Sequence, residues 1–172
     1  MRTWCRQGDP NTALANADLL IVQVDADVAF DPDNACAHPC PPPPNTVSAV
    51  QALVHQWLGT VPPARLLLCI PSMATETWAL VALFPGHDAV VPCDPPPADG
   101  ICVASRTDIK ALLRKAGRSF RPKLVVSQGG ELKSRAPGYR AVQDRISEGW
   151  PQVVATCGEA RRFDAALQTI LP

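Results

Sequence analysis

Two carboxylates that follow an apolar run are the residues of this chain best suited to chemistry. The run Leu19–Val24 is rich in branched side chains, and Asp25 and Asp27 come directly after it, separated by one residue. Side chains of a strand alternate with period two, so both carboxylates would point the same way at the rim of a sheet. Close carboxylates repel each other, and a hard divalent cation such as Mg²⁺ or Mn²⁺ relieves this repulsion. The spacing therefore predicts a metal site at Asp25 and Asp27.

A structural role for the same pair stays open. Aspartate is common at strand ends and in turns, where its side chain bonds nearby backbone amides, and Asp31 and Asp33 follow in the same loop. The run before Asp25, however, is typical of a central parallel strand, and ligands in open α/β sheets bind outside the carboxyl ends of strands. These features favour the metal site.

A third acidic candidate, Glu76, is the only charged residue in the apolar segment Ser72–Phe84. The segment predicts a helix capped by Ser72, and a carboxylate in its first turn would gain from the helix dipole. The preceding residues 65–70 predict a buried strand beside the one that leads to Asp25. Because a buried charge needs a partner, we expect Glu76 to reach the same metal.

The remaining pattern predicts the elements that position these residues. Apolar spacing predicts a helix from Val47 to Leu58, capped by Asn45 or Thr46, and thus a parallel strand–helix–strand crossover. Later elements are expected as follows: a short strand at 88–91, a capping box at 105–108 that opens a helix over 109–116, a strand at 123–127, a turn at 129–130 and helices from 139 onward. The expected fold is a single α/β domain over 1–172, a small, mostly parallel sheet with helices on both faces.

The composition is that of a globular protein. Apolar residues make up 47% of the chain and charged residues 19%, and no apolar run approaches the length of a membrane span. The first residues lack the apolar segment of a signal peptide, so we expect a cytoplasmic protein with no membrane partner. The seven cysteines, an odd number, predict reduced thiols. Cys36 and Cys40 hint at zinc, to which Cys93 and Cys102 could contribute.

The charges are distributed unevenly although they sum to zero. Residues 1–105, the expected sheet half, carry an excess of seven acidic residues, and residues 106–172, the mainly helical half, carry an excess of seven basic ones. Lys110, Arg114 and Arg118 are expected on one helix face, opposite its apolar residues. Such a surface could bind a polyanion such as nucleic acid, and a merely solvated helix face is an equal alternative.

The chain also resembles a bacterial family grouped with the Toprim-like folds, through a set of short motifs: Val24–Asp27, Ile70–Ser72, Thr75–Trp78, Lys133 ahead of Tyr139, and Cys157–Phe163. The resemblance implies a Toprim-like sheet that binds Mg²⁺, as in topoisomerases, primases and nucleases of the overcoming-lysogenization type. Asp25 and Asp27 would be the Toprim aspartate pair, and Glu76 the acidic residue of the following helix. Lys133, or Lys110 with Arg114, would steady the charge of a phosphate.

The chain departs from this family pattern in one respect. Toprim domains carry a glutamate at the end of an earlier strand, and no glutamate precedes Glu76 here. We expect that the sequence is N-terminally truncated or that the domain has lost this strand, which would leave the site inactive.

The expected function is therefore that of a Mg²⁺-dependent, nuclease-like protein, and three alternatives stay open. The first is a non-catalytic module that binds nucleic acid or protein. The second is a haloacid dehalogenase-like phosphatase with Asp25 as nucleophile and Asp27 as acid, although the later acidic pair of that fold is missing. The third is a glycosyltransferase that uses the two aspartates to hold Mn²⁺ and a sugar nucleotide.

Overall fold

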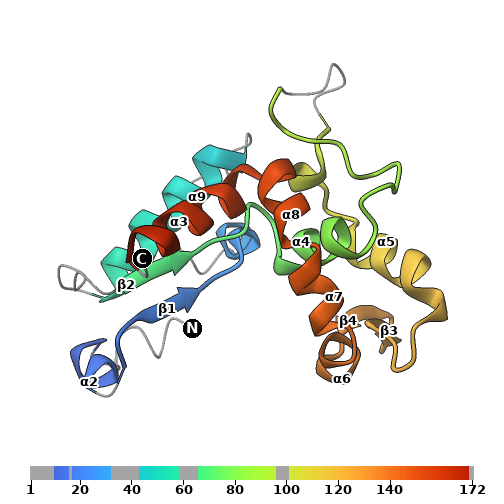
Figure 1. Ribbon diagram of the computed structural model, residues 1–172, viewed down its shortest axis with the longest axis horizontal. Helices are drawn as coiled ribbons and strands as arrows, with labels where there is room; N and C mark the ends of the chain where they lie inside the picture. Colours follow the sequence, from blue (N-terminus) through green and yellow to red (C-terminus); the bar gives the residue numbers. More distant parts are fainter. Residues whose placement is uncertain (1–9, 16, 32–42, 59–65, 96–100, 171–172) are drawn as a thin grey trace. The chain divides into compact units, whose positions relative to one another are not determined.

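The computed structural model describes residues 10–15, 17–31, 43–58, 66–95 and 101–170 of the chain. It is a mixed α/β structure with two small sheets (Figure 1). The chain divides into two compact units, the first made of Met1–Ala74 with Glu159–Pro172 and the second of Thr75–Gly158. The boundary between the acidic residues 1–105 and the basic residues 106–172 therefore falls inside the second unit. The single domain over 1–172 stays a prediction.

The first unit contains the predicted strand–helix–strand segment. Strands β1 (Leu20–Gln23) and β2 (Leu66–Cys69) pair in parallel, and helix α3 (Pro43–Leu58) lies between them in the sequence. The same unit holds α2 (Pro10–Leu14), the 3₁₀ helix η1 (Ala26–Phe30) and nearly all of α9 (Gly158–Ile170). The parallel crossover is thus confirmed, whereas the mostly parallel sheet is seen only as this one pair among the described residues.

The core of the first unit lies between α3 and one face of the strand pair. Apolar residues of α3 recur at helical spacing and pack against alternate strand residues; the buried members include Val22, Val24, Val47, Val50, Val54, Trp57 and Ile70. Helix α3 begins two residues before the predicted cap at Asn45, at Pro43. Proline is favoured in the first turn because its missing N–H would have no helical partner there.

The second unit is built around α4 (Thr75–Leu83), whose residues from Glu76 to Leu83 are all buried. Helix α4 contacts α5 (Ile109–Ala116), α7 (Gln143–Glu148) and α8 (Trp150–Thr156). The unit also contains the following elements: η2 (Val103–Ser105), η3 (Gly117–Ser119), β3 (Val125–Gln128), β4 (Glu131–Ser134) and α6 (Ala136–Arg140). Gly129 and Gly130 join β3 and β4 in an antiparallel hairpin with positive φ values of 62° and 84°, which glycine adopts without a steric penalty.

One further helix start and one helix cap differ from prediction. Helix α4 begins at Thr75 rather than after Ser72. The predicted capping box is also absent, because Ser105 lies in η2 and the Asp108 carboxylate accepts hydrogen bonds from Arg106 at 2.8 and 2.9 Å instead of capping α5.

The predicted strand at 88–91 is wrong. The chain turns here, because the Ala89 N–H donates to His87 Nδ1 at 3.1 Å and the Val90 N–H donates to the His87 carbonyl at 2.8 Å. Strand β4, in contrast, was not predicted at all.

The cysteines correct another expectation. Cys93 and Cys102 form a disulfide, so these two are neither reduced nor zinc ligands. Cys69 and Cys157 are free and buried, and burial raises the pKa of the Cys157 thiol to about 12. The predicted zinc pair, Cys36 and Cys40, lies outside the described residues. Within the described ranges, no helix combines the length and apolar character needed to cross a bilayer.

Candidate functional site

Strand β1 leads directly into the two predicted metal ligands. The N–H groups of Ala26 and Asp27 donate to the carbonyls of Pro71 and Met73, each over 3.0 Å. The residues after β1 are therefore fixed to the residues after β2. Asp25 lies between Ala26 and Val24, whose N–H donates to the Cys69 carbonyl at 3.0 Å. The pair consequently occupies a defined place at the carboxyl end of the two parallel strands.

Side-chain exposure alternates along this segment. The even-numbered residues Val22, Val24 and Ala26 are buried, and the odd-numbered residues are more open: Ile21, Gln23 and Asp27 exposed, Asp25 half-buried. Asp25 and Asp27 thus lie on the more open side, but β1 ends at Gln23 and Asp27 belongs to η1, so the predicted strand does not extend through the pair.

Asp25 is part of a local polar arrangement. The Gln23 amide donates to Asp25 Oδ1 at 2.6 Å. Burial, with a further contribution from the negative charge of Asp25, raises the pKa of the Cys69 thiol to about 11. The negative charge of Asp25 therefore acts on Cys69, the last residue of β2. Two partly open carboxylates fit Mg²⁺, which takes few protein oxygens and keeps several waters.

Glu76 belongs to the second unit, where it has other partners. Its side chain is 10% exposed, its Oε1 accepts a hydrogen bond from the Ser134 hydroxyl, and Lys110 Nζ lies 3.7 Å from the same oxygen. The partner that a buried carboxylate requires is thus supplied by α5 and β4. Burial, with a further contribution from Glu76, raises the pKa of nearby Tyr139 to about 12, while the Ser134 hydroxyl opposes this shift.

The other predicted site residues also lie in the second unit. Lys133 Nζ is 3.7 Å from Glu131 on the same strand, β4. Arg114 and Arg118 are exposed, with Lys115, on α5 and η3, and none of the three forms an ion pair with another described residue. Lys110 differs from them, because its ammonium group lies near Glu76 while the rest of its side chain is partly exposed to solvent. In the part of the chain that the structure describes, no three His, Cys, Asp or Glu side chains are grouped to hold a metal.

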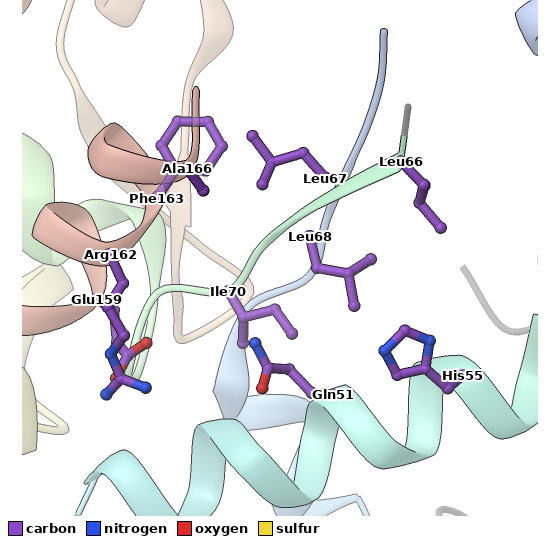
Figure 2. A pocket seen from close by; sticks show the side chains of 10 residues that line it. All are labelled: Gln51, His55, Leu66, Leu67, Leu68, Ile70, Glu159, Arg162, Phe163 and Ala166. Carbon is purple, nitrogen blue, oxygen red and sulfur yellow. The ribbon is translucent and has the colours of Figure 1, made fainter. Parts of the chain in front are cut away.

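A cavity that was not predicted lies in the first unit (Figure 2). Its volume is about 300 Å³, and it is formed by α3, β2 and α9. Its apolar lining includes Leu67, Phe163 and Ala166. The polar lining comes from four side chains: Gln51, His55, Glu159 and Arg162.

Glu159 and Arg162 form an ion pair within the first turns of α9. The Glu159 side chain is 7% exposed and that of Arg162 is 57% exposed. Burial raises the pKa of the Glu159 carboxyl, and the Arg162 guanidinium opposes this shift. The spacing of three residues on a helix is the one sequence feature from which this pair could have been predicted.

No family model, curated protein or solved structure was found to match the chain.

Proposed function

We propose that this chain is a Mg²⁺-binding protein of Toprim-like fold that acts on phosphodiester bonds. The observation that supports the proposal is the position of Asp25 and Asp27. Asp25 follows a parallel strand and Asp27 lies in the 3₁₀ helix η1 directly after it; both are at least partly open to solvent, and backbone hydrogen bonds to Pro71 and Met73 hold the segment in place. This is the edge at which α/β sheets bind ligands.

The residues have distinct roles in this proposal. Asp25 and Asp27 hold the cation, which when bound supplies a Lewis acid for phosphoryl oxygens and a water of lowered pKa. Gln23 orients Asp25 through its 2.6 Å hydrogen bond. Glu76 and Lys133 belong to the second unit, where Glu76 is engaged by Ser134 and Lys110 and Lys133 lies near Glu131, and neither is needed for this proposal.

A second candidate function is a non-catalytic module that binds nucleic acid. Its support is the exposed basic group of Arg114, Lys115 and Arg118, whose charges no described acidic residue neutralises. Phosphate contacts by such residues release counterions, so binding would weaken steeply with salt.

The enzyme proposal predicts hydrolysis of DNA that depends on Mg²⁺ and on Asp25. We expect the parent to cleave single-stranded or plasmid DNA with Mg²⁺ or Mn²⁺ and to lose this activity with excess chelator. Asp25→Asn should lose it at every metal concentration, because it removes a charge that holds the cation. Asp88→Asn, which changes an exposed acid in a turn of the second unit, is the matched control and should retain activity.

The same samples separate the two candidate functions. Salt-sensitive DNA binding without hydrolysis, weakened by reversing Arg114, Lys115 and Arg118 together, would favour the binding module. Hydrolysis that persists in Asp25→Asn would place the active site elsewhere.

A further inference from the structure

The cavity of the first unit runs along an edge of strand β2. Consecutive side chains of a strand point to opposite faces, yet Leu66, Leu67 and Leu68 all line the cavity. A cavity that touches both faces must lie beside the strand. No residue of β1 lines it, so it lies at the edge opposite β1 (Figure 2).

The strand register shows which backbone groups face this edge. The Val24 N–H donates to the Cys69 carbonyl, and Gln23 is the register partner of Cys69. In a parallel ladder, alternate residues of a strand bond to one neighbour, so the odd-numbered residues of β2 bond to β1. The N–H and C=O groups of Leu66 and Leu68 therefore point away from β1, toward the cavity.

The cavity has an apolar side and a polar side. Leu67, Phe163 and Ala166 lie together in Figure 2, while Gln51 extends from α3 and Arg162 from α9 on the other side. The volume of about 300 Å³ is at the lower end of the range of small-molecule sites. The size and the separation of surfaces suit a small amphipathic molecule.

The polar side favours an acidic head group. Glu159 is buried and engaged by Arg162, whereas the Arg162 side chain is more than half exposed. Both side chains line the cavity, and the guanidinium is the more accessible member of the pair because Glu159 Oε1 is engaged by Arg162. The Gln51 amide and the outward N–H groups of β2 add further donors, and guanidinium donors pair well with carboxylates.

We propose that this cavity binds a small organic acid, with its carboxylate at Arg162 and Gln51 and its apolar body against Leu67, Phe163 and Ala166. The site is separate from Asp25 and Asp27 in its lining residues and does not depend on the proposed metal chemistry. Asp25→Asn/Asp27→Asn should therefore bind the acid as the parent does.

Calorimetric titration of the full chain with octanoate tests the proposal, with 1-octanol and octylamine as probes of equal chain length. We expect octanoate to bind and both other probes to bind about tenfold more weakly or not at all, because a charge-assisted hydrogen bond is lost. Glu159→Gln/Arg162→Gln, which removes both charges of the ion pair, should lower the affinity for octanoate to the affinity measured for 1-octanol.

A second pair of variants tests the location. Ala166→Phe fills the cavity and should abolish octanoate binding, whereas Ala165→Phe, at an exposed neighbour outside the cavity, should leave it intact. Equal binding of all three probes would overturn the acidic preference. Absence of octanoate binding by the folded parent, or unchanged binding by a folded Ala166→Phe protein, would overturn the site.

Discussion

Replacing Gly149 with alanine is expected to lower the free energy of unfolding of the second unit by about 3 kcal/mol. Gly149 lies between α7 and α8, where a Cβ would stand 2.5 Å from the carbonyl oxygen and 2.8 Å from the Cα of Ala82 in α4. Both obstructing atoms are backbone, so no rotamer change relieves the overlap. The backbone at Gly149 has φ −78° and ψ −4°, which alanine adopts freely, so the cost comes from packing alone.

Urea unfolding followed by tryptophan fluorescence measures this effect. Trp78 and Trp150 form an edge-to-face pair with centroids 5.6 Å apart across α4 and α8, so their emission reports on this packing. Gly86→Ala is the matched control, because nothing lies within 4 Å of a Cβ there. An equal midpoint for Gly149→Ala and Gly86→Ala would contradict the close approach of α8 to α4.

Reducing the Cys93–Cys102 disulfide is expected to lower the free energy of unfolding by about 2–3 kcal/mol. The bond closes a short loop with a sequence separation of 9. Opening this loop gives the unfolded chain more conformations, which is the main way in which a disulfide acts. The measurement is the urea midpoint of the parent with and without a reductant.

Cys93→Ser/Cys102→Ala serves as the control for this effect. Its midpoint should equal that of the reduced parent and should not respond to the reductant. Thiol titration of the unfolded proteins should show that reduction releases two more thiols in the parent than in this variant. If the reductant lowered the urea midpoint of the parent and of the variant equally, the loss of stability would come from other cysteines.

The strand–helix–strand segment of the first unit was predictable because its pattern is local. Branched apolar residues before Asp25, and helical spacing from Val47 to Leu58, specify each element within its own few residues. The strand itself is shorter than predicted, because β1 ends at Gln23 and Asp27 lies in η1. The start of α3 was displaced because Pro43 is compatible with a first turn, whereas Asn45 and Thr46 are only frequent caps.

Strand β4 was missed because its pattern is weak. Glu131, Lys133 and Ser134 are polar and exposed, and Leu132 is the one apolar residue of the strand. Its pairing follows from the turn at Gly129 and from tertiary contact rather than from its own composition.

The partners of Glu76 were not predictable from position along the chain. Sequence alone indicates that a buried carboxylate needs a partner, but Ser134 is 58 residues away and Lys110 lies on a separate helix. The cavity likewise joins Gln51 of α3 with Arg162 of α9, which are brought together only by folding. Such long-range groupings leave no local pattern.

Calorimetric titration of Mg²⁺ into the parent and into Asp25→Asn/Asp27→Asn tests the central claim most directly. We expect the parent to bind Mg²⁺ and the double variant to give no heat of binding while keeping the melting temperature of the metal-free parent, since the loss of two close charges does not weaken the fold. Equal Mg²⁺ binding by the parent and the double variant would contradict the assignment of the metal to Asp25 and Asp27.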